Sequence, residues 1–234
     1  MQAAGIKQFE SILWDVDGTL LDFFSAEKEA IKSLFLEFGL GECTDEMLSC
    51  YSKINKKYWE KLEQGEMTKP QILVQRFEEF FKVEGIEPSL GEGFNTAYQK
   101  RLGDTIIFCD NSKEIVASLQ GKIRQYVVSN GTIVAQTKKL ERSGFDKLMD
   151  GVFLSEQIGY EKPSKEFFDW VFQKIRPMDK NKVLIVGDSL TSDIAGGNRV
   201  GIKTCWYNPK ALINDTSVKA DYEIQNLGDI LKLL

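Results

Sequence analysis

The sequence contains no histidine among its 234 residues. This absence excludes the Ser-His-Asp and Cys-His types of nucleophilic catalysis, zinc and non-haem iron sites built on imidazole, and phosphohistidine chemistry. Any catalysis by this chain must therefore use carboxylates, lysine, hydroxyl groups, backbone amides or a metal ion that prefers oxygen ligands.

Cysteine is also scarce, and no two cysteines form a Cys-x-x-Cys pair; the four are Cys43, Cys50, Cys109 and Cys205. Thiols scattered in this way are typical of a reduced cytosolic protein rather than a disulfide scaffold. The first ten residues lack the apolar core of a signal peptide, and no run of about 18 apolar residues occurs. We therefore expect a soluble, cytoplasmic protein.

Basic residues are in slight deficit, since 30 lysines and arginines against 35 acidic residues give a net charge of −5. A chain with this balance lacks the positive surface of a protein that binds nucleic acid or anionic membranes. We expect neither a nucleic-acid polymer nor a membrane as a partner, and a monomer or a weak homo-oligomer. The length is consistent with one domain that carries an insertion, or with two small domains.

Short apolar runs recur along the chain, and each stops abruptly at a polar residue; they cover residues 12–14, 126–128, 152–154 and 183–186. Continuous apolarity is typical of strands that are buried on both faces. Helical patterns separate the later runs, over residues 111–120, 132–143, 164–175 and 192–200. This alternation predicts right-handed βαβ units and an α/β fold with a doubly wound, Rossmann-like parallel sheet.

Residues 23–103 differ from the rest, because they contain no strand-like run and their apolar residues recur at helical spacing. Thr68 and Gln71 have the spacing of a capping box, and glycine and proline divide the segment into about four helices. An insertion of about 80 residues is far longer than an ordinary connection in an α/β unit. We predict a helical domain over residues 23–103 and an α/β core domain over residues 1–22 and 104–234.

Polar residues follow the predicted strands: Asp15 and Asp17 the first, Ser129-Asn130-Gly131 the second, Lys162 the third and Gly187-Asp188 the fourth. In an open α/β sheet, ligands bind outside the carboxyl ends of the strands. Clustered carboxylates need a cation, and with oxygen ligands alone Mg²⁺ is the expected one. The lysine, the hydroxyl and the backbone amides of the Ser-Asn-Gly turn suit a bound anion. Together these residues predict a magnesium-assisted phosphoryl site.

Each of these residues also has a structural explanation when it is taken alone. Asp17-Gly18 suits a turn, the Ser-Asn-Gly segment suits the cap of the next helix, and Lys162 suits the surface. Asp188 and Asp193 suit the start of a helix near residue 192, where acidic residues complement the helix dipole. Their joint placement, in order and at successive strand ends, favours the site.

This ordered set resembles the motifs of the haloacid dehalogenase-like hydrolase (HAD) superfamily. Its DxDGT motif corresponds to residues 15–19, its second motif to Ser129, its third to Lys162, and its fourth to the segment from Gly187 to Asp193. The match spans about residues 11–207, with all four motifs in order. The resemblance implies that the helical insertion is the α-helical cap of the first subclass of this superfamily.

The resemblance also implies roles for the catalytic residues. Asp15 is expected to be the nucleophile that forms an aspartyl-phosphate, and Asp17 the general acid and base. Ser129 and Lys162 are expected to hold the phosphoryl oxygens. An aspartate at position 17 favours a phosphatase or a phosphomutase, because the dehalogenases of the superfamily lack it and work without a metal.

The same resemblance implies the ligands of the site. Mg²⁺ is expected on the carboxylates of Asp15 and Asp188 and on the backbone carbonyl of Asp17. Phosphate is expected to bind at the turn formed by Ser129, Asn130 and Gly131 together with Lys162. Asp193 is expected to orient Lys162 or the surroundings of the metal.

A second resemblance lies in the helical insertion, which is similar to that of bacterial pyrimidine 5′-nucleotidases over a run that includes Tyr51, Asn55, Tyr58-Trp59-Glu60, Gly65 to Thr68, Arg76-Phe77 and Phe80-Phe81. It implies hydrolysis of pyrimidine nucleoside monophosphates, although the same aromatic residues suit packing among the helices. The alternatives are a sugar-phosphate phosphatase or a mutase similar to β-phosphoglucomutase, and more remotely a non-enzymatic phosphoacceptor or binding module.

Overall fold

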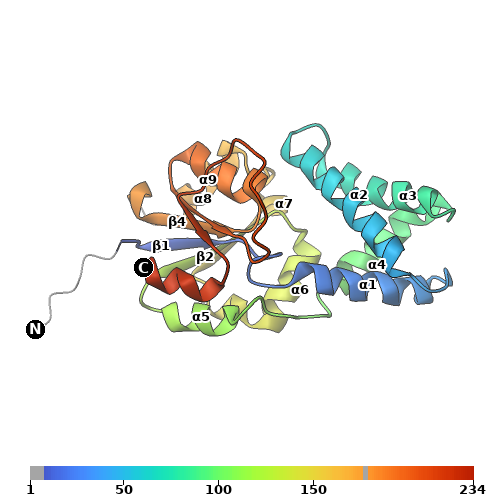
Figure 1. Ribbon diagram of the computed structural model, residues 1–234, viewed down its shortest axis with the longest axis horizontal. Coiled ribbons are helices and arrows are strands. Elements are labelled where there is room, and N and C mark those ends of the chain that lie inside the picture. Colours follow the sequence, from blue (N-terminus) through green and yellow to red (C-terminus); the bar gives the residue numbers. More distant parts are fainter. Residues whose placement is uncertain (1–7, 176–178) are drawn as a thin grey trace, which may run out of the picture. The chain divides into compact units, whose positions relative to one another are not determined.

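The computed structural model describes residues 8–175 and 179–234, which form two compact units (Figure 1). The α/β unit comprises the chain up to Asp22, Phe108–Gly131 and Ser143–Leu234. The helical unit comprises Phe23–Ile107 and Thr132–Arg142. The helical unit begins where the helical domain is expected to begin, but it also includes residues 104–107 and Thr132–Arg142, which we expect in the core domain. Residues 1–7 of the expected core domain lie outside the described residues.

The α/β unit is built on a six-stranded sheet with the order β3-β2-β1-β4-β5-β6, in which every neighbouring pair is parallel. The strands are β1 (Ser11–Trp14), β2 (Arg124–Ser129), β3 (Gly151–Leu154), β4 (Val183–Gly187), β5 (Lys203–Tyr207) and β6 (Tyr222–Ile224). The four predicted strands are confirmed, and β5 and β6 extend the sheet beyond the prediction. The predicted fold class, a doubly wound parallel α/β sheet, is confirmed.

Helices cover both faces of this sheet, with α8 and α9 on one side and α5 on the other (Figure 1). The helices of the unit are α5 (Ser112–Leu119), α7 (Ser155–Ile158), α8 (Lys165–Lys174) and α9 (Ala195–Val200), with a turn of π-helix at Leu190–Ile194 and 3-10 turns at Phe145–Lys147, Lys180–Lys182 and Leu227–Lys232. Every residue of β1 and β4 is buried between these layers. Burial on both faces explains why the apolar runs in the sequence are continuous.

The helical unit contains the four helices predicted between residues 23 and 103, together with α6. Their bounds are α1 (Phe23–Glu37), α2 (Asp45–Glu63), α3 (Lys69–Val83), α4 (Gly91–Arg101) and α6 (Ile133–Ser143), with a 3-10 turn at Pro88–Leu90. At the start of α3, Gln71 Oε1 accepts a hydrogen bond from the backbone N–H of Thr68 at 2.9 Å, as a capping box requires.

An aromatic cluster forms the core of the helical unit; it comprises Phe35, Tyr51, Phe77, Phe80, Phe81, Phe94 and Tyr98, all fully buried. Tyr51 and Phe77 stack with their ring centres 4.9 Å apart. Four aromatic residues of the nucleotidase-like run therefore pack the unit itself. Helix α6 joins the unit because Ala135 belongs to the same apolar core and Lys138 forms an ion pair with Asp104 at 2.6 Å.

Within the part of the chain that the structure describes, no helix combines the length and the apolarity needed to cross a membrane.

Candidate active site

The predicted site residues lie at the carboxyl edge of the sheet in the α/β unit. Strand β1 pairs with β2 on one side and with β4 on the other, in a register that places Trp14 opposite Val127 and Val186. The next residues along these strands therefore reach the same edge. The connection reverses direction across the sheet at β1 and β4, and this switch point is where open α/β sheets bind ligands.

Lys162 lies at the centre of this edge, with 1% of its side chain exposed. Its ammonium group donates hydrogen bonds to Asp15 Oδ1 at 2.8 Å, to Asp193 Oδ1 at 2.6 Å and to the carbonyl oxygen of Val128 at 2.8 Å. All three N–H bonds of the ammonium are thus used. Burial alone would lower the pKa of Lys162, but the two carboxylates outweigh it and raise this pKa above its ordinary value. Lys162 is therefore held as a cation.

Asp15 follows β1 directly, and its backbone N–H donates to the carbonyl of Val186 at 2.9 Å. Its Oδ1 accepts from Lys162, whereas Oδ2 is buried without a hydrogen-bond partner among the described residues. Burial raises the pKa of Asp15 to about 7, the charge of Lys162 opposes this rise, and the charge of Asp193 adds to it. A buried carboxylate oxygen without a partner is costly unless a ligand satisfies it.

Asp188 and Asp193 complete an acidic group with Asp15, in which one carboxylate oxygen of each residue lies within 4.8 Å of the others. Removal from water raises the pKa of Asp188 well above its ordinary value, and the charges of Asp15 and Asp193 raise it further. Three clustered carboxylates and one lysine leave negative charge uncompensated. The oxygen donors and the unpartnered Oδ2 of Asp15 therefore fit a divalent cation such as Mg²⁺.

Two glycines leave the space that these carboxylates occupy. Gly18, with a φ of +89°, lies so close to Asp188 that a Cβ atom there would collide with its carboxylate. A Cβ atom on Gly187 would collide in the same way with the carboxylate of Asp193. The glycine of the DxDGT motif therefore both adopts a left-handed turn and makes room for Asp188.

Thr19 and Trp206 hold the backbone of Asp188 from two sides. The N–H of Asp188 donates to Thr19 Oγ1 at 3.0 Å, and the indole N–H of Trp206 donates to the carbonyl oxygen of Asp188 at 2.9 Å. Trp206 lies on β5, which is not one of the four strands predicted from the sequence. Its contribution to the site was therefore missed, whereas Thr19 belongs to the recognised motif.

The remaining predicted residues lie at the same edge. Asp17 lies in the turn after β1, and its charge contributes to raising the pKa of Asp15. Ser129, at the end of β2, is buried, and its Oγ accepts from the N–H of Gly131 at 3.0 Å. Asn130 Nδ2 donates to the carbonyl oxygen of Lys162 at 2.8 Å, and Asn130 Oδ1 accepts from the N–H of Lys162 at 2.8 Å.

The helical unit contains a buried network of hydrogen-bonded polar side chains that we do not predict from the sequence. Arg76, 1% exposed, donates to Asn55 Oδ1 at 2.6 Å and to Asn95 Oδ1 at 3.3 Å. Asn55 in turn donates to Glu27 Oε2 at 3.0 Å, as does the hydroxyl of Tyr98 at 3.0 Å. Burial raises the pKa of Glu27 to about 7, against the opposing effects of Tyr98 and Arg76. Asn55 and Arg76 belong to the nucleotidase-like run, but nothing in their spacing indicates that they pair.

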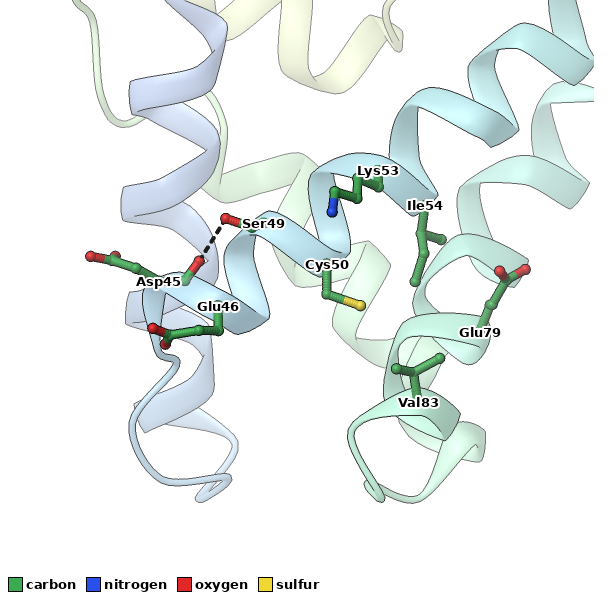
Figure 2. A pocket seen from close by; sticks show the side chains of 8 residues that line it. All are labelled: Asp45, Glu46, Ser49, Cys50, Lys53, Ile54, Glu79 and Val83. Atoms are coloured by element: carbon green, nitrogen blue, oxygen red, sulfur yellow. Dashed lines mark hydrogen bonds between the residues drawn. The ribbon is translucent and has the colours of Figure 1, made fainter.

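The helical unit also bears a surface groove between α2 and α3 (Figure 2). It is lined by Asp45, Glu46, Ser49, Cys50, Lys53 and Ile54 of α2 and by Glu79 and Val83 of α3. Two of its acids already form ion pairs outside this lining, Asp45 with Lys28 at 3.0 Å and Glu79 with Lys57 at 3.1 Å. None of the predicted site residues lines this groove.

The family model for haloacid dehalogenase-like hydrolases matches residues 12–207. The chain belongs to this family. The hydrolase is 34% identical over 229 residues to the HAD-hydrolase YfnB of Bacillus subtilis, across 98% of this chain and 97% of YfnB. The crystal structure of YfnB bound to magnesium superimposes with a TM-score of 0.90 at 35% identity, over 97% of this chain and 99% of that one.

Two further relatives of the hydrolase are pyrimidine 5′-nucleotidases. PynA of Streptococcus pneumoniae is 34% identical over 227 residues, which cover 97% of this chain and 95% of PynA. YjjG of Escherichia coli is 27% identical over 227 residues, which cover 97% of this chain and 98% of YjjG. Both matches extend over nearly the whole of this chain, and so over the helical unit as well as the α/β unit.

Proposed function

We propose that this hydrolase is a magnesium-dependent phosphatase that acts on pyrimidine nucleoside 5′-monophosphates through an aspartyl-phosphate intermediate. One observation carries the proposal: at the switch point of the sheet, one oxygen of the buried Asp15 carboxylate accepts from Lys162, and the other has no hydrogen-bond partner in the part of the chain that the structure describes. This arrangement suits a nucleophile that is held beside a cation and open to a ligand.

In the proposed first step, a carboxylate oxygen of Asp15 attacks the phosphorus, and the bond between phosphorus and the nucleoside oxygen breaks. Asp17 gives its proton to the leaving oxygen. In the second step, a water molecule attacks the phosphorus and Asp17 takes its proton. The bond between phosphorus and Asp15 then breaks, so that inorganic phosphate leaves and both aspartates return to their first state.

Lys162 has two tasks in this scheme. Its ammonium, 2.8 Å from Asp15 Oδ1, favours the ionised carboxylate that attack requires, against the burial that raises the pKa of Asp15 to about 7. It also neutralises charge that develops on the phosphoryl oxygens, together with the hydroxyl of Ser129. Asp193, 2.6 Å from the ammonium, holds the lysine in place.

The proposed ligands of Mg²⁺ are the carboxylates of Asp15 and Asp188 and the backbone carbonyl of Asp17. When bound, Mg²⁺ supplies positive charge that offsets the repulsion between the phosphate and these carboxylates. The close grouping of the Asp15 and Asp188 oxygens, and the space left by Gly18, support this assignment.

The preference for pyrimidine nucleotides rests on PynA and YjjG, whose similarity to this chain covers both units. The test is phosphate release in Mg²⁺ from UMP, CMP and dTMP, from AMP and GMP, and from sugar phosphates, with EDTA as a control. We expect rates with pyrimidine monophosphates to exceed those with sugar phosphates at least about tenfold, and EDTA to abolish release. A flat or sugar-preferring profile contradicts the nucleotidase assignment and leaves the phosphatase.

A mutase is distinguished by its product. Conversion of β-glucose 1-phosphate into glucose 6-phosphate, without release of inorganic phosphate, would replace the phosphatase proposal by a phosphomutase. Release from none of these compounds contradicts both enzymes. The cytoplasmic location and the monomeric or weakly oligomeric state stay predictions.

A further inference from the structure

The side chain of Asn130 is directed at the main chain of Lys162. Its Nδ2 donates to the Lys162 carbonyl oxygen and its Oδ1 accepts from the Lys162 N–H, both at 2.8 Å. A third contact joins Nδ2 to Ser192 Oγ at 3.5 Å. In these two short bonds the side-chain amide of Asn130 pairs with the N–H and C=O of Lys162, as a backbone peptide group pairs in a sheet. They attach the loop that carries Lys162 to the end of β2.

Lys162 is thereby fixed at both ends to one segment of chain. Its ammonium donates to the carbonyl oxygen of Val128, and its main chain is bound by Asn130, two residues further on. A lysine side chain has four rotatable bonds and about 2 kcal/mol of rotamer entropy. Fixing the main chain limits the positions from which the ammonium can reach Asp15 and Asp193.

We propose that Asn130 is a positioning residue, whose side chain acts on catalysis by holding the main chain of Lys162 so that the ammonium stays on Asp15. The inference rests on the proposed function for its catalytic consequence. It adds a role for the side chain of Asn130, whose amide is bonded at both of its polar atoms, to the sequence-based expectation that the backbone amides of the Ser129-Asn130-Gly131 turn bind phosphate.

The first test is a crystal structure of Asn130→Ala beside that of the wild type, which needs no substrate. The variant is expected to shift the loop and to lengthen the distance from Lys162 Nζ to Asp15 Oδ1 beyond about 3.5 Å, the limit of a hydrogen bond. A Lys162 that keeps its position and its bond to Asp15 would overturn the proposal. Asn130→Asp, which keeps the acceptor but not the donor, provides a second variant if the alanine variant does not fold.

The second test is a double-mutant cycle with Lys162→Ala, in which kcat/KM is measured with p-nitrophenyl phosphate. Asn130→Ala alone is expected to lower kcat/KM by about 10- to 100-fold, because a misplaced catalytic group costs this much. In the Lys162→Ala background the same change is expected to cost less than about twofold. Losses that multiply fully would show that Asn130 acts independently of Lys162 and would overturn the proposal.

The matched control is Asn198→Ala, since Asn198, at an exposed position of α9, also donates from its amide to a main-chain carbonyl, that of Lys219, at 2.8 Å. It is expected to leave kcat/KM unchanged in both backgrounds. If the wild type hydrolyses no phosphomonoester at all, the proposed function fails, and the crystal structures still decide whether Asn130 holds Lys162.

Discussion

The ammonium group of Lys162 lies 2.8 Å from the carboxylate of Asp15, although 147 positions separate the two residues in the sequence. The parallel sheet brings them together. Strands β1 and β3 lie on either side of β2, run in the same direction and therefore end at the same edge, where the segments that carry Asp15 and Lys162 begin. Asp193 shares the same ammonium at 2.6 Å. The lysine therefore stabilises two buried carboxylates and presents one of them, Asp15, at the switch point.

Lys162→Met is expected to reduce kcat by at least about 100-fold, since removing one charge-stabilising donor in an active site commonly costs this much. It also leaves two buried carboxylates without their cation, so the free energy of unfolding is expected to fall by about 3 kcal/mol. Steady-state kinetics and denaturant unfolding measure the two effects. Lys165→Met, which removes an exposed ion pair with Asp169, is the control and is expected to change neither.

Gly18→Ala is expected to abolish most of the activity, because the added Cβ atom collides with the carboxylate of Asp188. Gly201→Ala is the matched control: Gly201 also has a positive φ, +75°, but among the described residues no atom outside its own stretch of chain lies within 4 Å of a Cβ atom placed there. Both variants carry a backbone cost of about 1–2 kcal/mol, and only Gly18→Ala affects the site. Equal losses of activity in the two variants would mean that backbone strain, rather than the displacement of Asp188, is responsible.

Trp206→Phe removes the indole N–H that donates to the carbonyl oxygen of Asp188 at 2.9 Å. Partners that orient a metal ligand typically contribute 10- to 100-fold to metal affinity. The concentration of Mg²⁺ needed for half-maximal activity is therefore expected to rise by at least about tenfold. Trp170→Phe, on α8, is expected to leave it unchanged, and an unaltered requirement in Trp206→Phe would contradict a role for this hydrogen bond.

Glu27 makes the stability of the protein depend on pH. Its pKa is about 7 when folded, against an ordinary value of 4.5, because the residue is buried. Between these values the folded protein keeps a proton that the unfolded chain has lost, so the contribution of Glu27 to stability falls as the pH rises, and is constant above about 7. Glu27→Gln removes this dependence.

The free energy of unfolding of the Glu27→Gln variant, minus that of the wild type, is therefore expected to grow by up to about 3 kcal/mol between pH 5 and pH 8. Urea unfolding at several pH values measures this difference. The control is Glu141→Gln, at an exposed position of α6. A difference between Glu27→Gln and wild type that does not change with pH would contradict the account of Glu27.

The residues at the sheet edge could be predicted because each of them is indicated by its immediate neighbours in the sequence. Each site residue follows an apolar run, and parallel strands buried on both faces are recognisable from such runs alone. Strand β5 (Lys203–Tyr207) was missed because no helical pattern or site residue follows it, and β6 (Tyr222–Ile224) has only three residues. Trp206 and its bond to Asp188 were missed with them.

Contacts between distant segments could not be predicted in the same way. The chain from Glu27 through Asn55 to Arg76 joins three helices, and in the sequence these residues look like ordinary polar positions. Asn130 lies in the turn whose backbone is expected to bind phosphate, and only the structure shows that its side-chain amide bonds to the main chain of Lys162. Helix α6 belongs to the helical unit because of its tertiary packing, and the spacing of apolar residues predicts a helix there without showing which unit it packs against.

The most direct test of the proposed chemistry is the rate of phosphate release from UMP in Mg²⁺ by the wild type, Asp15→Asn and Asp146→Asn. Asp146 is an exposed aspartate of the same unit and provides the matched control. The account predicts equal rates for the wild type and Asp146→Asn, and a rate at least about 1,000-fold lower for Asp15→Asn, because removal of a nucleophile leaves only residual catalysis. An Asp15→Asn variant that folds and keeps more than about a tenth of the wild-type rate would contradict the assignment of Asp15 as the nucleophile.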